Sequence, residues 1–148
     1  MFTRQCDSCG SRSQIDSKKL VDDSYCDKCR STLHPPGEVI RVTLRELADA
    51  AENQRVPILA VFTSPTCVNS QLLAKFLPKT AEKFVGKALI FELVVDDNPD
   101  AAALGVRGTP TWLIGKRGTL LHRHEGLIDQ PQLDAWIREA MRVSFPQQ

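Results

Sequence analysis

The sequence lacks an excess of charge of either sign. Its 148 residues contain 19 Lys and Arg against 18 Asp and Glu, so the formal net charge is +1. A protein that binds nucleic acids or anionic membranes through a general basic field needs a clear excess of Lys and Arg. We therefore expect no nucleic acid and no membrane among the partners of this chain.

Long hydrophobic runs are also lacking. The unbroken apolar runs, such as Ile-Leu-Ala-Val-Phe at 58–62, are far too short for the core of a signal peptide or for a membrane span. The start of the chain turns polar directly after Phe2. This pattern predicts a soluble protein of the cytoplasm.

Cysteine is scarce and odd in number. The five cysteines are Cys6, Cys9, Cys26, Cys29 and Cys67. An odd number in a reducing compartment argues against a structural disulfide framework. Four of them are paired in the sequence, and one stands alone.

The four paired cysteines predict a structural zinc site. Cys6-Asp-Ser-Cys9 and Cys26-Asp-Lys-Cys29 are two C-x2-C motifs, and the spacing between them is typical of a four-thiolate zinc ribbon. Two intervening residues allow both thiolates of one motif to face the same ion, and two motifs complete a tetrahedral shell. We expect one Zn²⁺ with a closed ligand set that does not catalyse.

These motifs have three other interpretations. They are a redox dithiol, a disulfide pair, and a catalytic zinc with an open position. A catalytic zinc keeps only three protein ligands, so a fourth cysteine favours the structural site. The nearby His34 is expected to lie in solvent, because four cysteines already complete the shell.

The first 36 residues contain few side chains that can form a hydrophobic core. The sizeable candidates are Ile15, Leu20, Val21, Tyr25 and Leu33. The metal must therefore supply most of the folding free energy, about 10–16 kcal/mol for structural zinc in peptides. We expect this segment to be unfolded without metal. Gly10, directly after the first motif, eases the turn there.

The cluster His-Pro-Pro-Gly at 34–37 separates two regions of different texture. We place a zinc ribbon at residues 1–36 and a second domain at residues 37–148. The total length leaves room for one ordinary domain and a small accessory module.

The second region alternates between strand and helix patterns. The expected elements are a strand at 39–42, a helix from the Thr43–Glu46 capping box, a strand at 57–63, a helix over 67–84, a strand at 87–95, a short helix from Asn98, a hairpin of 111–115 and 119–125, and a helix from Asp129. The first helix should bury Leu44, Leu47, Ala48 and Ala51, and Pro78 must kink or break the second. This order predicts an α/β sandwich with a mixed sheet.

Several motifs stand at fixed places relative to these elements. They are the two C-x2-C motifs, Cys67 after the strand at 58–62, Gly-Val-Arg-Gly-Thr-Pro-Thr at 105–111, Gly118 and Gly126. In this combination the chain resembles the thioredoxins, and in particular the second, zinc-binding type of bacterial thioredoxin. The resemblance implies a thioredoxin-like three-layer sandwich with a mixed central sheet, preceded by a small N-terminal zinc ribbon.

The resemblance also implies a substrate-binding site. Pro110 matches the family's cis-proline, although a trans proline at a strand start stays open. The residue before it, Thr109, would pair with the substrate backbone, and Gly126 would line the substrate groove. Thr66 matches the residue before the nucleophile and completes the expected substrate-binding set.

The active-site motif departs from the family. Thioredoxins read Trp-Cys-Gly-Pro-Cys, and this chain reads Thr-Cys-Val-Asn-Ser at 66–70. Cys67 can attack a disulfide as a thiolate, because it stands at a helix N-terminus. Ser70 cannot form a disulfide and so cannot release a substrate, but its hydroxyl can donate a hydrogen bond to the thiolate.

Further departures point the same way. Val61 stands where the family buries an aspartate, and Glu92 matches a family lysine. Lys75 stands where the family has its helix-kinking proline, so the second helix is expected to bend elsewhere. Because the surrounding positions differ too, we favour a natural single-cysteine protein over a trapping variant.

Two functions of different classes follow. In the first, Cys67 forms a mixed disulfide with a protein or glutathione disulfide, and an external thiol reductant resolves it, as part of cell redox homeostasis. In the second, the domain is a non-catalytic binding or chaperone-like module. An iron–sulfur cluster shared between two subunits through Cys67 has no further support in the sequence.

Two other side-chain pairs need an interpretation. His122 and His124 alternate along a strand at a spacing that could bind metal, but without a third ligand a solvated edge is favoured. Trp112 and Trp136 are expected in or near the core, with Trp112 as a possible flank of the groove.

Overall fold

The strand β6 (Ile58–Thr63) is the centre of a five-stranded mixed sheet. It pairs in parallel with β7 (Leu89–Val94), which in turn pairs in parallel with the short β5 (Ile40–Arg41). On its other side it pairs antiparallel with β8 (Thr111–Lys116), and β8 pairs with β9 (Thr119–Glu125). All six residues of β6 are buried, as the apolar run predicts for a strand covered on both faces.

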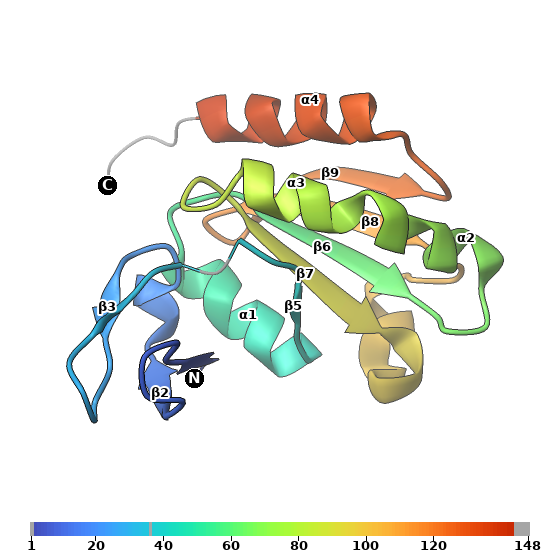
Figure 1. The fold of residues 1–148 in the computed structure, drawn as a ribbon. Coiled ribbons are helices and arrows are strands. Elements are labelled where there is room, and N and C mark those ends of the chain that lie inside the picture. Colours follow the sequence, from blue (N-terminus) through green and yellow to red (C-terminus); the bar gives the residue numbers. More distant parts are fainter. Residues whose placement is uncertain (1, 36, 144–148) are drawn as a thin grey trace.

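Helices cover both faces of this sheet in the computed structural model, which describes residues 2–35 and 37–143 (Figure 1). The helix α1 (Leu44–Asn53) lies on one face. On the other lie α3 (Leu77–Lys83) and α4 (Gln130–Arg142). The predicted three-layer α/β sandwich is thus confirmed. None of the helices in the described ranges is long and apolar enough to span a membrane.

The capping box of α1 is present as predicted. The Thr43 hydroxyl accepts from the Glu46 N–H (3.2 Å), and the Glu46 carboxylate accepts from the Thr43 N–H (3.0 Å). The buried face of α1 differs from the predicted one in one residue. Ala50 is fully buried, whereas Ala48, which was expected to be buried, is exposed. Residues two apart on a helix point in nearly opposite directions, so only one of these two alanines can face the sheet.

The second helix breaks as Pro78 requires. It consists of α2 (Val68–Leu72), a 3₁₀ turn η2 (Leu73–Lys75) and α3. Pro78 stands in the first turn of α3, where its missing N–H has no helical partner to lose. The bend therefore lies between η2 and α3.

The remaining elements follow the sequence pattern with small changes. The segment after Asn98 is the 3₁₀ helix η4 (Pro99–Leu104), which follows another 3₁₀ turn, η3 (Val95–Asp97). Arg117 (φ 52°) and Gly118 (φ 79°) form the two-residue turn between β8 and β9.

The N-terminal segment consists of two small hairpins. The first pairs β1 (Phe2–Gln5) with β2 (Arg12–Ile15), and the second pairs β3 (Ser24–Tyr25) with β4 (Thr32–Leu33). The turn η1 (Ser17–Lys19) connects them. Pro36, where the expected domain boundary falls, lies outside the described residues.

Arg4 joins these two hairpins. Its buried guanidinium donates hydrogen bonds to the backbone carbonyls of Asp22 (2.8 Å) and Leu20 in the connecting segment and of Leu33 (3.4 Å) in the second hairpin. Burial lowers the pKa of Arg4, while the charges of Asp23 and Asp22 oppose that shift. A buried cation thus links the first hairpin to the rest of the N-terminal segment.

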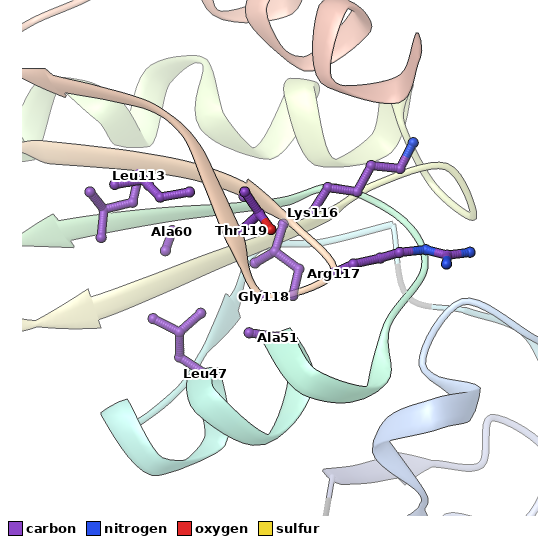
Figure 2. Close-up of a pocket in the computed structure, with 11 residues that line it drawn as sticks. Leu47, Ala51, Ala60, Leu113, Lys116, Arg117, Gly118 and Thr119 are labelled. Atoms are coloured by element: carbon purple, nitrogen blue, oxygen red, sulfur yellow. The ribbon is translucent and has the colours of Figure 1, made fainter. Parts of the chain in front are cut away.

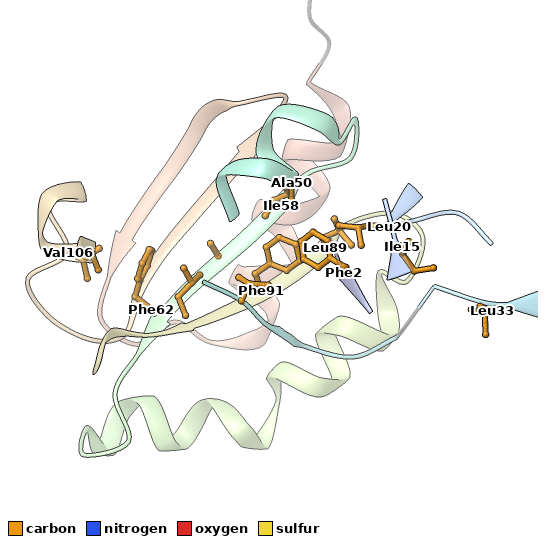
Figure 3. Packing of buried hydrophobic residues seen from close by; sticks show 14 of the residues in the cluster. Phe2, Ile15, Leu20, Leu33, Ala50, Ile58, Phe62, Leu89, Phe91 and Val106 are labelled. Atoms are coloured by element: carbon orange, nitrogen blue, oxygen red, sulfur yellow. The ribbon is translucent and has the colours of Figure 1, made fainter. Parts of the chain in front are cut away.

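The N-terminal hairpins share a hydrophobic core with the sheet. Phe2 stacks on Phe91 of β7, with 6.0 Å between ring centroids and 19° between ring planes (Figure 3). Ile15, Leu20 and other ribbon residues belong to the same buried cluster. The expectation that Tyr25 is buried was wrong, because its ring is 64% exposed. Phe2, which the sequence did not single out, is the aromatic residue that anchors the ribbon.

This packing predicts a large stability loss for Phe2→Ala. The change removes a buried ring against Phe91, so the free energy of unfolding should fall by about 3 kcal/mol in denaturant titrations. Tyr25→Ala is the matched control, since it removes an exposed ring of the same hairpins and should change stability by less than about 0.5 kcal/mol. Equal effects of the two substitutions would contradict the anchoring role of Phe2.

Candidate functional site

The four N-terminal cysteines converge on one point. Their Sγ atoms all lie within 4.8 Å of one another. The Cys6 and Cys29 sulfurs are 3.5 Å apart, and those of Cys9 and Cys26 are 3.6 Å apart. No disulfide joins them. The hairpins therefore bring together the two motifs that the sequence placed in one site.

The two motifs have the same backbone geometry. The N–H of Gly10 donates to the Cys6 carbonyl (2.8 Å), and the N–H of Arg30 donates to the Cys26 carbonyl (3.0 Å). Both donors have positive φ, 77° at Gly10 and 65° at Arg30. Glycine adopts this conformation at no steric cost, whereas at Arg30 the turn is formed despite its side chain.

The donor set fits a tetrahedral metal. Four thiolates around zinc at about 2.3 Å lie about 3.8 Å apart, which is close to the observed sulfur separations. The backbone N–H groups of Cys29 and Lys28 lower the pKa of Cys26 to about 6 and so favour its thiolate form. At Cys6 the backbone N–H of Cys9 acts in the same direction, but burial and the sulfurs of Cys29 and Cys9 outweigh it and raise the pKa to about 11. His34 is exposed and pairs instead with Asp23 (3.0 Å), as expected for a residue outside the shell.

Cys67 lies apart from this cluster, at the end of the central sheet. The strand β6 ends at Thr63, and a short loop leads to Cys67, which is the N-cap of α2. The Cys67 N–H donates to the Ser64 carbonyl (3.1 Å), which closes that loop. The side chain is half-buried and free.

The loop before β8 faces Cys67. The Thr109–Pro110 peptide bond is cis, as the resemblance predicted. The Cys67 Sγ lies 3.2 Å from the Thr109 carbonyl oxygen, to which the protonated thiol donates. Cys67 and the cis-proline loop are 42 residues apart in the chain and adjacent in space.

The environment of Cys67 lowers its pKa from 9.0 to about 7. The largest cause is the Thr109 side chain, followed by the backbone N–H and then the hydroxyl of Ser70; burial opposes them. The Thr109 carbonyl favours the protonated thiol and also works against the shift. The sequence indicated Ser70 and the helix N-terminus but missed the Thr109 hydroxyl, whose only signal was its place directly before Pro110.

Ser70 is buried beside Cys67. Its Oγ accepts a hydrogen bond from the Ser64 N–H (3.2 Å), which leaves its own hydroxyl hydrogen free to donate. The Thr66 side chain is exposed and turned away, because its hydroxyl lies 3.0 Å from that of Ser64. Of the two, Ser70 contributes to the lowered pKa of Cys67.

Gly126 lies on the other side of the cis peptide. Its N–H donates to the Pro110 carbonyl (2.8 Å), and its φ of +95° favours glycine. A Cβ built at this position would meet nothing within 4 Å, so the surface beyond it is open. The structure thus places Thr109 at the Cys67 sulfur and Gly126 at the adjacent Pro110.

Val61 and Glu92, two positions at which the chain departs from the family, have different surroundings. Val61 is fully buried on β6. Glu92 on β7 accepts from the Thr63 hydroxyl (3.1 Å) and from Arg41 (3.2 Å). Glu92 and Ser70 line a polar pocket of about 390 Å³ behind α2.

The two histidines of β9 pack against the ring of Trp136. The rings of His122 and His124 lie 3.9 Å and 5.2 Å from that of Trp136, between centroids, and are tilted by 49° and 57° to it. His122 is exposed and His124 is half-buried, as expected for a solvated edge. Trp112 is fully buried, as predicted. Across residues 2–35 and 37–143, the four-cysteine group is the one cluster of three or more His, Cys, Asp or Glu side chains close enough to hold a metal.

An apolar pocket lies away from both sites. It measures about 150 Å³ and lies between α1 and the β8–β9 hairpin (Figure 2). Leu47, Ala51, Ala60 and Leu113 form its wall. No cysteine lines it, so it takes no part in thiol chemistry.

Comparisons with known proteins agree with this architecture. The family of thioredoxin-like domains matches residues 44–141. The chain is similar to the thioredoxin of Haemophilus influenzae, with 32% identity over 103 residues that span 69% of this chain and 96% of that protein. It is also similar to thioredoxin C-3 of Corynebacterium nephridii, with 23% identity over 139 residues, 93% of this chain and 94% of that protein.

Solved structures give the same result. A mutant thioredoxin from Halobacterium salinarum superposes with a TM-score of 0.67 and 29% identity, over 74% of this chain and 96% of that one. Chloroplastic thioredoxin z superposes with a TM-score of 0.64 and 25% identity, over 70% and 94% of the two chains. The chain therefore belongs to the thioredoxin-like family, and its α/β sandwich is the thioredoxin fold.

Proposed function

We propose that the protein carries out thiol–disulfide exchange with Cys67 as its single reactive thiol. One observation carries this proposal: the Cys67 sulfur lies at the cis-proline loop with its pKa lowered to about 7, while Ser70 occupies the place of a second cysteine. Family membership supports thiol–disulfide oxidoreductase chemistry in general. The proposed setting is the cytoplasm, where external thiols are available.

The proposed exchange takes place in two successive steps. The Cys67 thiolate attacks one sulfur of a substrate disulfide, so that a new Cys67–sulfur bond forms, the substrate's S–S bond breaks, and the other half leaves as a thiolate. An external thiolate such as glutathione then attacks the mixed disulfide. A bond forms between the external sulfur and the partner's sulfur, the Cys67–sulfur bond breaks, and Cys67 leaves as a thiolate. When the partner is glutathione, the product is oxidised glutathione. When the partner is a protein, a second external thiol attacks the new mixed disulfide, the protein thiol leaves, and the two external thiols end as a disulfide, so the external thiol is the reductant.

The role proposed for Ser70 is to stabilise the attacking thiolate. Its free hydroxyl hydrogen can donate to the Cys67 sulfur, together with the Thr109 hydroxyl. A hydroxyl cannot displace a sulfur from a disulfide, so the mixed disulfide waits for an outside thiol.

The substrate strand is proposed to dock on the loops around Cys67. Thr109 offers its backbone, Gly126 leaves open space for a partner chain, and Pro110 fixes the turn between them. Thr66, exposed beside Cys67, would contact the substrate from the other loop. Both protein and glutathione mixed disulfides are candidate substrates.

A second candidate function is non-catalytic binding of polypeptides. It is favoured by two apolar side chains beside these loops, Val68 and Leu127, which are 69% and 44% exposed. Exposed apolar residues next to an open groove are typical of a protein-binding surface. Under this function a Cys67→Ala variant would retain the same partners as the wild type, whereas thiol exchange requires that it loses them.

We further propose that Cys6, Cys9, Cys26 and Cys29 hold one structural Zn²⁺. The closed set of four sulfurs leaves no position for a reacting water. Bound zinc would cross-link the two hairpins, the first of which carries Phe2 and Arg4. The ribbon is then held by metal, by the buried Arg4 and by the shared core.

The Cys67 environment predicts a thiol that becomes active near neutral pH. Alkylation of Cys67, located by mass spectrometry, should rise with pH and reach half its maximum at about pH 7, because only the thiolate reacts. Thr109→Val should move this midpoint upward toward 9.0, since it removes the largest contribution. The remote Thr119→Val is the control. A wild-type midpoint near 9.0 would contradict the proposed nucleophile.

The missing second cysteine predicts weak turnover. With a dithiol reductant at low concentration, the wild type should reduce insulin slowly, and Ser70→Cys should raise the rate by at least about tenfold through an intramolecular second step. Ser70→Ala is the control, because it changes the hydroxyl without adding a sulfur and should gain nothing. Wild-type turnover equal to that of Ser70→Cys would contradict the single-cysteine mechanism.

The metal site predicts two populations of thiols. The native protein should contain one equivalent of zinc and show one reactive thiol, and a strong chelator should release the metal together with four more, which makes five. Cys67→Ser should bind the same amount of metal, whereas Cys9→Ser should bind it far more weakly. Five reactive thiols before chelation, or bound iron instead of zinc, would contradict this assignment.

A further inference from the structure

A chain of hydrogen bonds leads from a buried tryptophan to the proposed docking loop. The indole Nε1–H of Trp112 donates to the Gly126 carbonyl (2.9 Å), and the Gly126 N–H donates to the Pro110 carbonyl (2.8 Å). Both peptide groups on either side of the Gly126 Cα are thereby restrained. The chain ends at the cis-proline loop, whose Thr109 carbonyl contacts the Cys67 sulfur.

Trp112 is well placed to hold this loop firmly. It is fully buried on β8, in register with Val61 of β6 and His124 of β9. Its ring belongs to the core cluster under α3 and α4. A side chain locked in the core by packing can hold its hydrogen-bond partner at a fixed position, whereas an exposed side chain cannot.

Gly126 needs such a restraint. Glycine has more conformational freedom than any other residue, and the open space beyond its Cα offers no packing to fix it. The next residue, Leu127, is exposed, and the residue after it, Ile128, is buried in the core. The orientation of the Gly126 peptide groups therefore depends on the bonds from Trp112 and to Pro110.

We propose that Trp112 is a positioning residue for polypeptide substrates, which holds the Gly126 loop against the cis-proline loop through its indole N–H. The inference rests on the proposed function, because it concerns how a substrate reaches Cys67. An extended peptide that carries a disulfide must lie along both loops, while a small disulfide needs only the sulfur. Trp112 thus favours polypeptides among the candidate substrates.

A preformed loop affects binding more than chemistry. If Gly126 is already oriented, a peptide does not have to order it on binding, so preorganisation raises affinity. The reacting sulfur and the groups that stabilise its thiolate do not include Trp112. Loss of the indole N–H should therefore raise the half-saturating peptide concentration and leave the limiting rate constant nearly the same.

The test is single-turnover capture by the metal-loaded, full-length protein. The probe is a ten-residue peptide whose cysteine is joined to a chromogenic thiol, and the released thiol is followed against peptide concentration. For Trp112→Phe, the half-saturating concentration should rise about five- to tenfold and the limiting rate constant should stay within about twofold. The ratio of peptide capture to the reaction with a small chromogenic disulfide should fall by the same factor.

Trp136→Phe is the matched control. Trp136 is a second tryptophan on the same face of the sheet, and its ring packs at a tilt against His122 and His124. Its replacement should leave both capture parameters within about twofold of the wild type. An equal rise in both variants would mean a general loss of packing and would overturn the inference.

The remaining outcomes separate the inference from the function on which it rests. A folded Trp112→Phe protein with the wild-type half-saturating concentration overturns the role of Trp112 alone. A wild type that captures neither probe overturns the proposed function and this inference with it. If Trp112→Phe does not fold, Trp112 is replaced by 3-benzothienylalanine, which keeps the double ring without the N–H and must give the same rise.

Discussion

The antiparallel pairing of β6 with β8 is the constraint on which the rest of the site depends. Phe62, near the end of β6, lies in register with Thr111 at the start of β8. The loop that leaves β6 and the loop that enters β8 are therefore at the same edge of the sheet. This register brings the Cys67 sulfur within 3.2 Å of the Thr109 carbonyl oxygen, although the two residues are 42 positions apart in the chain. A slip of one residue would turn every side chain of one strand to the other face and separate the two loops.

Parts of this molecule that depend on local chemistry could be predicted from the sequence. The Thr43–Glu46 capping box, the break at Pro78 and the two C-x2-C motifs are each specified by residues a few positions apart. Other features depend on what lies opposite in space. Phe2 is buried because Phe91 faces it, and periodicity within β1 gives no sign of that partner. The Thr109 hydroxyl acts on Cys67 only because β6 and β8 pair, so sequence alone gave its position without its effect.

The cysteine sulfurs of this chain have two kinds of environment. Backbone N–H groups lower the pKa of Cys26 to about 6, and Thr109 and Ser70 lower that of Cys67 to about 7. The difference lies in the neighbours, because Cys26 is fully buried among three other sulfurs, while Cys67 has none near it and is half-exposed. A thiolate surrounded by thiolates requires a cation, whereas one at an open groove can react with an incoming disulfide.

Val61 and Ser70, which both differ from the family pattern, are consistent with each other. An ionised carboxyl group buried at Val61 would lie in an apolar layer next to Trp112, where its desolvation is unfavourable unless a proton transfer or a partner makes use of it. With Ser70 in place of a second thiol there is no sulfur beneath the surface that must gain or lose a proton. The apolar pair of Val61 and Trp112 then packs without an unpaired charge. This packing fixes the Trp112 ring, whose N–H donates to the Gly126 carbonyl. In the proposed single-cysteine mechanism, the missing second step thus leaves the apolar floor of the site free to orient the docking loop.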